Sequence, residues 1–296
     1  MRVLITGGLG FLGATIAKRL AARGAQIRLF DQVSDRSLVT RIVGDPAGAF
    51  EWMTGDISKG ADVDRAADGT DLIVHLAGLL TPACARDPVR GAEVNVIGTL
   101  NVFAAATRLK HAQVIYTSSA SVFGKEDGAN PFPWTHYGAY KLANEGAARA
   151  YFDDHGLSSV GFRPFVVYGY GRESGISAGA SLACRAAARG EAYTIPFTGR
   201  TGFVYVDDIA RAYEVAAFSS RTGAHLVDLD GVVASVDEVI ASIRAVVPDA
   251  RISAEGPVLP VVADIASVST DPVIGALPVT PLGEGIRQTI EAYRKV

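Results

Sequence analysis

The first 31 residues follow an order of elements that restricts the chain to a small set of folds. Residues 2–6 (RVLIT) are an apolar run typical of a buried strand, and residues 11–24 carry apolar side chains at helical spacing and end in a glycine. Residues 25–31 (AQIRLFD) form a second apolar run. A strand, a tight turn, a helix and another strand indicate a βαβ unit, from which parallel sheets are built.

The same alternation continues to about residue 168. Four more apolar runs predict strands, at residues 50–56, 71–78, 112–119 and 158–169. Long helices are expected between them, at about 91–109 and from Tyr137 to about Asp154. Because helices that connect parallel strands cover both faces of the sheet, the sequence predicts an α/β fold with a Rossmann-like, doubly wound parallel sheet.

The second half of the chain does not continue the regular alternation of strands and helices. Residues 169–181 are rich in glycine and serine and predict a loop, and residues 203–218 predict a strand followed by a helix that Asp207 or Asp208 could cap. Two further helices are expected, near 235–247 and 283–295. We therefore expect a nucleotide-binding domain interleaved with a smaller C-terminal substrate-binding lobe. The expected boundaries are residues 1–168 plus roughly 203–228 for the domain, and residues 169–202 and 229–296 for the lobe.

Composition excludes several classes of function. Hydrophobic residues make up 49% of the 296-residue chain and charged residues 20%, so a buried core is easily built. The net charge of −3, with scattered Lys and Arg, gives no footprint for nucleic acid. Cys84 and Cys184 are too few for a disulfide framework, and no histidine spacing suits zinc. Without a signal peptide or a long apolar run, we expect a soluble, cytoplasmic protein with no membrane, nucleic-acid or metal partner.

A glycine-rich turn joins the first strand to the first helix. Gly7, Gly10 and Gly13 stand at the spacing G-x-x-G-x-x-G in TGGLGFLG. A backbone that turns tightly, approaches a pyrophosphate and packs a helix on a sheet favours residues without a Cβ. Free N–H groups near Phe11 and Leu12 would then face the phosphates. The turn alone is weak support, since a strand–helix turn without a ligand can have the same glycines.

Asp31 strengthens the prediction of a dinucleotide site. It ends the second strand, where a carboxylate accepts hydrogen bonds from the adenosine ribose hydroxyls. The same carboxylate repels a 2′-phosphate, so NAD is favoured over NADP. One aspartate at a strand end is often only a turn residue, but strand, glycine turn, helix, strand and acid stand here in the expected order.

Candidate catalytic residues lie in the middle of the chain. Tyr137 and Lys141 are four residues apart in THYGAYKLANE, so a helix places them on one face, although this spacing also occurs by chance. The strand before them ends in the hydroxyls Ser118 and Ser119. Because ligands of doubly wound sheets bind at the carboxyl ends of the strands, these hydroxyls should lie beside the nicotinamide.

Together these motifs resemble the extended short-chain dehydrogenase/reductase family, which includes the NAD-dependent epimerases and dehydratases. The resemblance covers nearly the whole chain. Its motifs are TGGLGFLG (6–13), GDI (55–57), HLAG (75–78), NVIGT (95–99), SSASVFG (118–124), the Tyr137–Lys141 pair and RPFVVYG (163–169).

The resemblance implies a role for each matching residue. Tyr137 is the general acid/base, Lys141 lowers its pKa and holds the nicotinamide ribose, and Ser119 orients the reacting oxygen. Lowering a tyrosine pKa from about 10 by ~3 requires about 4 kcal/mol of phenolate stabilisation. The remaining expected cofactor contacts are Asp56 and Ile57 at the adenine, Leu76, Ala77 and Gly78 on the phosphate side, Asn95 as a structural and proton-relay neighbour, Thr117 and Pro164.

Departures from the family pattern bear on the reaction. Nucleotide-sugar enzymes usually have Asn at the position of Val166, where it contacts the substrate diphosphate, and Arg-Asp where this chain has Arg200 followed by TGF. No arginine occurs in residues 258–272. We therefore expect an NAD-dependent dehydrogenase or reductase acting on an alcohol or carbonyl of a small polar substrate, such as a sugar acid or lactone. The alternatives are a nucleotide-sugar epimerase with transient oxidation and, less favoured, a non-catalytic NAD-binding regulator.

The expected substrate contacts are fewer. Arg172 could bind a carboxylate or a hydroxyl-rich substrate, or be a solvated loop charge. Ser119, Phe123 and Tyr168 are expected beside it, with Trp134 as a further aromatic wall, although each aromatic could instead be core. The resemblance also implies a homodimer formed through helices 91–109 and 138–154.

Overall fold

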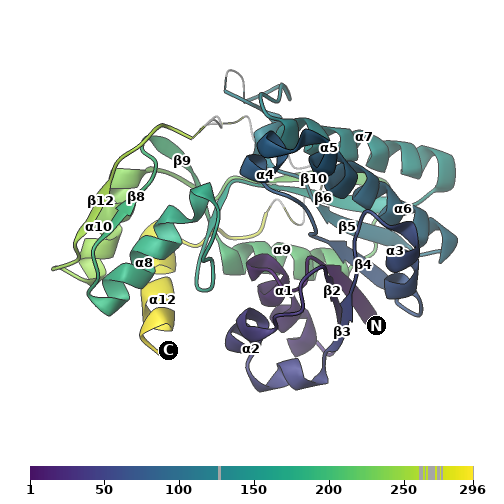
Figure 1. Cartoon of the computed structure of the whole chain (residues 1–296), viewed down its shortest axis with the longest axis horizontal. Coiled ribbons are helices and arrows are strands. Elements are labelled where there is room, and N and C mark those ends of the chain that lie inside the picture. The colour runs from purple at the N-terminus through teal and green to yellow at the C-terminus, as the bar shows by residue number, and fades with distance from the viewer. Residues whose placement is uncertain are drawn as a thin grey trace.

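A seven-stranded parallel sheet forms the centre of the protein (Figure 1). The computed structural model describes residues 1–125, 128–259, 263, 265, 271, 274 and 276–295. The strand order is β10-β6-β5-β4-β1-β2-β3. The strands are β1 Arg2–Thr6, β2 Gln26–Asp31, β3 Glu51–Thr54, β4 Leu72–His75, β5 Gln113–Thr117, β6 Ser158–Pro164 and β10 Ala224–Leu229. The order reverses between β1 and β4, where ligands of such sheets bind, and the predicted fold class is confirmed.

Helices cover both faces of this sheet (Figure 1). On one face lie α1 Phe11–Ala22, α2 Ser37–Val43 and α9 Val206–Ala217. The other face carries α3 Gly60–Ala67, α6 Gly98–Arg108 and α7 His136–His155. The short helices α4 Thr81–Arg86 and α5 Pro88–Ala92 precede α6, and a π-helical turn, Glu93–Ile97, joins α5 to it. The helix expected over residues 91–109 is therefore present without a break, and its first part is a π-helical turn.

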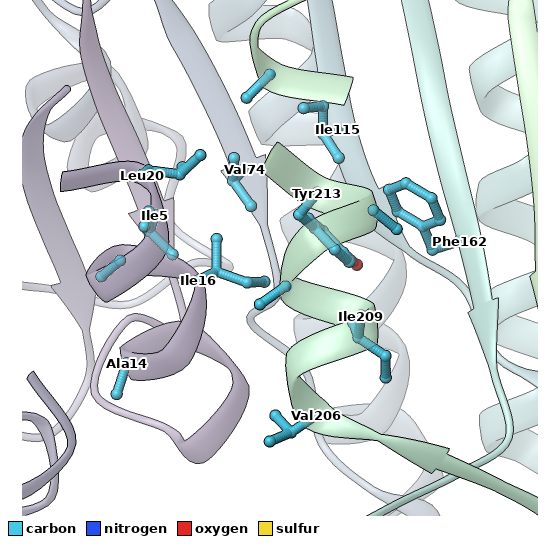
Figure 2. Close-up of a cluster of buried hydrophobic side chains, with 14 of the residues drawn as sticks. Ile5, Ala14, Ile16, Leu20, Val74, Ile115, Phe162, Val206, Ile209 and Tyr213 are labelled. Atoms are coloured by element: carbon cyan, nitrogen blue, oxygen red, sulfur yellow. The ribbon is translucent and has the colours of Figure 1, made fainter. Parts of the chain in front are cut away.

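The core between the sheet and helices α1 and α9 is the largest apolar cluster (Figure 2). Tyr213 of α9 points toward Phe162 of β6, with ring centroids 4.4 Å apart, and Ile16 of α1 and Ile5 of β1 belong to the same cluster. All four side chains are essentially inaccessible. Burying a side chain of this size stabilises the fold by ~1.5–3 kcal/mol. This packing anchors α9, which the chain reaches only after leaving the central sheet.

In the part of the chain that the structure describes, the second lobe contains two small sheets and the helices α8, α10 and α12 (Figure 1). Its sheets have the orders β11-β9-β7 and β12-β8. The elements are β7 Val166–Tyr168, α8 Gly179–Arg189, β8 Tyr193–Ile195, β9 Arg200–Tyr205, β11 Val232–Ser235, α10 Val236–Val246, β12 Ile252–Ala254 and α12 Leu282–Arg294. Ser235 and Glu238 form a capping box at the start of α10, so this helix begins where the sequence predicts.

Three local predictions were wrong. Residues 158–169 are two strands in different sheets, because the chain leaves the central sheet after Pro164 and pairs again as β7 with β9. The helix α8 starts inside the predicted loop, and its buried alanines and Cys184 pack in the core of the second lobe. Neither Asp207 nor Asp208 caps α9: Asp207 pairs with Arg19, Asp208 accepts from Thr280, and the N-cap residue is Tyr205.

Two structural features bear on partners. In the part of the chain that the structure describes, no helix combines the length and the apolar character needed to cross a membrane. Within the same residues, no group of three or more His, Cys, Asp or Glu side chains is arranged to hold a metal ion. Most of residues 258–272, where the sequence lacks arginine, lie outside the described residues.

Candidate active site

A cavity of about 780 Å³ opens at the carboxyl ends of the central strands. Residues that follow β1, β4 and β5 line one side, and residues of β7, β9 and the loop after β7 line the other. The cavity therefore lies at the point where the strand order reverses and extends toward the second lobe. It is large enough for a dinucleotide and a small substrate to meet.

The glycine turn lines one end of this cavity. Gly7 has φ of +67°, and a Cβ there would stand 2.8 Å from the Ala77 nitrogen. A Cβ on Gly13 would stand 2.6 Å from the Gly7 oxygen. The helix α1 starts at Gly10 without a side-chain cap or an acidic residue in its first turn, so its N–H groups near Phe11 and Leu12 are left to the cavity. This open, positively polarised helix end fits a pyrophosphate.

Asp31 lines the cavity at the end of β2. Its Oδ2 accepts from the Leu9 nitrogen at 3.1 Å and its Oδ1 from the Val33 nitrogen at 3.3 Å. These bonds tie the carboxylate to the glycine turn and fix its direction. An acid held in this place fits the ribose contact predicted from the sequence.

Asp56 and Ile57, which the resemblance predicts to contact the adenine, line the cavity. Arg90 Nη2 donates to Asp56 Oδ2 at 2.8 Å, and the Ser58 hydroxyl donates to Asp56 Oδ1 at 2.7 Å. Although burial opposes it, these bonds hold the pKa of Asp56 below its usual value. Arg90, on α5, is a residue that sequence reasoning missed, because 34 positions separate it from its partner.

The helix α7 carries Tyr137 and Lys141 on one face. It begins after Thr135, whose hydroxyl accepts from the Gly138 nitrogen at 3.0 Å, and ends at Gly156 in the left-handed region. Lys141 Nζ donates to the Thr117 carbonyl oxygen at 2.7 Å. The same atom lies 5.6 Å from the centre of the Tyr137 ring. The predicted pair, the hydroxyl of Ser119 and the end of β5 thus meet at one wall of the cavity.

The electrostatics of Tyr137 differ from the expectation. Burial raises its pKa to about 12, while a hydrogen bond with Ser119 and the charge of Arg172 act in the opposite direction. Burial also lowers the pKa of Lys141 to about 8. The role of Lys141 in lowering the Tyr137 pKa stays a prediction, and in this structure its ammonium is directed to the Thr117 carbonyl. The cation that favours the phenolate is Arg172.

A buried ion network stands behind the catalytic helix. Glu145, one turn after Lys141, accepts from Arg163 Nη2 at 2.6 Å and from the Ser118 hydroxyl at 2.5 Å. The guanidinium of Arg163 also reaches Asp228 at 3.5 Å. The Glu145 side chain is fully buried. This network connects α7, β6, β10 and the residue that follows β5. It engages the Ser118 hydroxyl, so that Ser119 is the hydroxyl of this pair that hydrogen-bonds Tyr137.

Most predicted cofactor and substrate residues line the cavity. They are Gly7, Gly10, Phe11, Leu12, Asp31, Asp56, Ile57, Leu76, Ala77, Gly78, Thr117, Ser119, Tyr137, Lys141, Pro164 and Arg172. The structure thus brings together residues from the ends of six strands, the start of α1, helix α7 and the loop after β7.

Three predicted residues lie apart from the cavity. Phe123 is buried with its ring 5.0 Å from the Arg163 guanidinium, and Tyr168 is buried in the core of the second lobe. Asn95 lies behind Gly78, where its Nδ2 donates to the Leu79 and Gly91 carbonyl oxygens. A Cβ on Gly78 would stand 2.7 Å from Asn95 Oδ1, so Asn95 supports the wall without forming it. Trp134 is half exposed and packs on Phe132.

Thr201 is a cavity residue that sequence reasoning missed. It lies on β9, where neighbouring side chains point to opposite faces. Arg200 therefore points outward and pairs with Glu238 at 3.3 Å, while Thr201 is buried toward the cavity. The alternation of a strand over residues 200–205 could have revealed this, but the predicted strand began at residue 203.

A family model matches residues 3–227 of the chain, and its description is the NAD dependent epimerase/dehydratase family. The matched range holds the glycine turn, Asp31, the hydroxyl run and the Tyr137–Lys141 pair. It also includes α9 and most of β10, the elements that return to the central sheet.

Individual proteins are similar to the chain as well. The UDP-glucose 4-epimerase of Mycolicibacterium smegmatis is 28% identical, with 99% of both chains covered. The 3-beta-hydroxysteroid dehydrogenase of Mycolicibacterium neoaurum is 30% identical over 58% of this chain and 49% of its own, so the chain spans about half the length of that relative. The crystal structure of the Thermus thermophilus UDP-glucose 4-epimerase with NAD superposes with a TM-score of 0.82, at 25% identity and 99% coverage of both chains.

Proposed function

The chain belongs to the NAD-dependent epimerase/dehydratase family, and we propose that it is a dehydrogenase or reductase that moves hydride between NAD and an alcohol or carbonyl of a small polar substrate. The predicted family and the predicted cofactor, NAD, are confirmed by this membership. The substrate class that we propose is a sugar acid, a lactone or a similar metabolite without a nucleoside diphosphate.

The cavity residues divide the reaction between them. When bound, NAD supplies the carbon that accepts hydride from the substrate. Tyr137 takes the proton of the substrate hydroxyl in oxidation and returns it in reduction. Ser119, which hydrogen-bonds Tyr137, holds the same substrate oxygen. Lys141 uses one N–H on the Thr117 carbonyl and keeps two for the ribose hydroxyls of the cofactor.

One observation carries the choice of a substrate without a diphosphate. Among the described residues that line the cavity, Lys141 and Arg172 are the only cations. Val166 lines the cavity where nucleotide-sugar relatives usually have Asn, and its side chain cannot donate to a phosphate. Arg200, at the place of the usual Arg-Asp, does not line the cavity and pairs with Glu238. A diphosphate brings two negative charges into the site, and phosphates in proteins are typically met by Arg, Lys or backbone N–H groups.

A second candidate is a nucleotide-sugar epimerase that oxidises its substrate transiently and returns the hydride. It is favoured by the relatives whose similarity extends over the whole chain, since the Mycolicibacterium smegmatis and Thermus thermophilus proteins are both UDP-glucose 4-epimerases. Both candidates use the same Tyr137, Ser119 and Lys141 step. They differ in whether NADH leaves and in what the second lobe binds.

The absorbance of NADH distinguishes the two. Purified protein is mixed with NAD and, separately, with sugar acids, lactones, polyols and UDP-sugars, and products are identified by NMR. We expect NADH to accumulate beyond one equivalent per subunit with a substrate that lacks a diphosphate. Conversion of a UDP-sugar to its epimer without net NADH would replace the first candidate by the second.

The quaternary state and the location stay predictions. We expect a homodimer through α6 and α7, since the resemblance implies pairing of these helices, and a cytoplasmic protein. A mass that stays monomeric at every concentration in light scattering would contradict the dimer.

A further inference from the structure

The loop after β7 places one arginine against the reacting group. Arg172 lines the cavity, and its guanidinium is fixed from behind: Nη1 donates to the Val167 carbonyl oxygen and Nη2 to the Ser177 hydroxyl at 2.7 Å. These bonds occupy two of its five N–H donors. Because these two bonds fix the guanidinium, its remaining donors keep a defined direction.

Arg172 has no acidic partner among the residues that the structure describes. Its neighbour Glu173 pairs instead with Arg41 of α2 at 3.2 Å. Burial lowers the pKa of Arg172 to about 10, so the side chain still carries its charge at neutral pH. A partly buried cation without a counter-ion is unfavourable unless a ligand supplies the charge.

The distribution of charge in the cavity favours an anionic ligand at Arg172. The acids Asp31 and Asp56 lie at the adenosine end and already accept from backbone N–H groups and Arg90. At the catalytic end stands Lys141, whose ammonium is engaged by the Thr117 carbonyl. Arg172 is thus the one described cation of this end whose donors remain available to a substrate.

Arg172 also acts directly on the reacting residue. Both side chains line the same cavity, and the charge of Arg172 favours the phenolate of Tyr137. An anion held by Arg172 therefore shares the cavity with the reacting oxygen. The pyrophosphate of the cofactor belongs to the opposite side, at the glycine turn.

We propose that Arg172 binds a carboxylate of the substrate beside the carbon that Tyr137 and NAD oxidise, so that the substrate is a hydroxy acid of the sugar-acid type. A carboxylate matches the planar fork of the guanidinium and can accept two parallel hydrogen bonds. The proposal rests on the proposed function for the hydride step. The contact between Arg172 and the carboxylate is tested on nucleotide sugars as well, with UDP-glucuronic acid against UDP-glucose.

The experiment compares substrates that differ only in the carboxylate. D-glucuronate and D-galacturonate are measured against D-glucose and D-galactose, and UDP-glucuronic acid against UDP-glucose. Each pair is tested for turnover with NAD and for the melting temperature of the NAD-loaded protein. We expect the wild type to prefer the acid in at least one series by roughly 10–100-fold in kcat/KM, the range of a charge-assisted bidentate contact.

Variants then assign the preference to Arg172. Arg172→Gln should remove the acid preference, mostly through KM, and leave the Kd of NAD unchanged. Arg172→Lys should keep part of it, since the charge stays and the fork is lost. Arg189→Gln, which removes an exposed arginine of α8 away from the cavity, is the control. It should retain the preference for the acid.

The outcomes separate three explanations. If only nucleotide sugars react but the uronic acid is still preferred, the proposed small substrate fails and the carboxylate site stands. If Arg172→Gln raises the Kd of NAD, the guanidinium serves the cofactor and the proposal is overturned. The proposal is also overturned if Arg172→Gln loses equal kcat/KM for acid and neutral substrates. It is overturned as well if the wild type shows no preference for the acid in any pair, by turnover or by melting temperature.

Discussion

Lys141 Nζ donates to the carbonyl oxygen of Thr117 at 2.7 Å and lies 5.6 Å from the centre of the Tyr137 ring. The lysine is thus positioned by the end of β5, and the phenol by Ser119. Arg172 supplies the charge that favours the phenolate. Three side chains, Lys141, Ser119 and Arg172, thus lie in the cavity with Tyr137, whereas the Tyr–Lys spacing alone points only to Lys141.

Tyr137→Phe should lower turnover by roughly 10²–10⁴-fold, because it removes the only proton carrier of the hydride step. Tyr140→Phe is the matched control, since the Tyr140 hydroxyl donates to the Pro88 carbonyl oxygen outside the cavity. Steady-state rates and the Kd of NAD are measured for both. Retained turnover in Tyr137→Phe would favour a non-catalytic NAD-binding protein.

The rate of alcohol oxidation should rise with pH from 7 to 10. A tyrosine with a pKa of about 12 is protonated over this range, and oxidation needs a phenolate to accept the proton. Carbonyl reduction needs the protonated phenol and should not rise. Arg172→Gln should shift the oxidation profile to higher pH because it removes a charge that favours the phenolate. The profile of log kcat/KM tests this, and a flat oxidation profile would contradict it.

Lys141→Met should stabilise the protein without NAD at pH 7 while it abolishes turnover. The pKa of Lys141 falls from 10.5 in a free lysine to about 8 in the fold. Below pH 8 the fold buries a charge, at a cost of up to about 3 kcal/mol. Between pH 8 and 10.5 only the unfolded chain keeps the proton, so the wild type gains stability as pH rises.

Urea unfolding of wild type and Lys141→Met at pH 7 and pH 9.5 measures this difference. We expect the advantage of the variant to shrink at the higher pH. The comparison cancels the effect of Tyr137, which is present in both proteins and loses stability above pH 10. An advantage that stays constant with pH would mean that Lys141 is not buried as a charge.

Glu145→Ala should destabilise the fold by about 3–5 kcal/mol, because it leaves Arg163 buried with less compensation. The side chains of this pair are 0% and 7% exposed. Glu291→Ala breaks the exposed ion pair with Arg287 on α12 and should leave the unfolding midpoint unchanged. Urea unfolding of both variants provides the test. Equal midpoints for the two would show that the network adds nothing to stability.

Asp31→Ala should weaken the discrimination between NAD and NADP. The carboxylate is fixed by the Leu9 and Val33 nitrogens, and it repels a 2′-phosphate at close range. We expect kcat/KM for NAD to fall by roughly 10-fold and that for NADP to rise. Asp35→Ala, in the exposed loop that follows, is the control. An unchanged NAD/NADP ratio in Asp31→Ala would remove Asp31 from the ribose site.

The sequence by itself determined the elements whose parts are close along the chain. The glycine turn, Asp31 and the Tyr137–Lys141 spacing each lie within one βαβ unit or one helix, and local geometry places them correctly. The alternation of strands and helices was enough to predict a doubly wound parallel sheet, and the strand order came from the structure. The phosphate end and the catalytic helix were therefore predictable.

Only the tertiary structure decided the substrate end. Thr201 faces the cavity and Arg200 faces solvent because β9 pairs with β7 and β11, strands that lie far from it in sequence. Phe123 turns away from the substrate because Arg163 offers it a buried cation. Arg172 lines the cavity because the chain leaves the central sheet after Pro164 and pairs again as β7 with β9. Each outcome depends on strand pairing and packing between distant segments, and a single-residue shift of register would reverse which side chain enters the cavity.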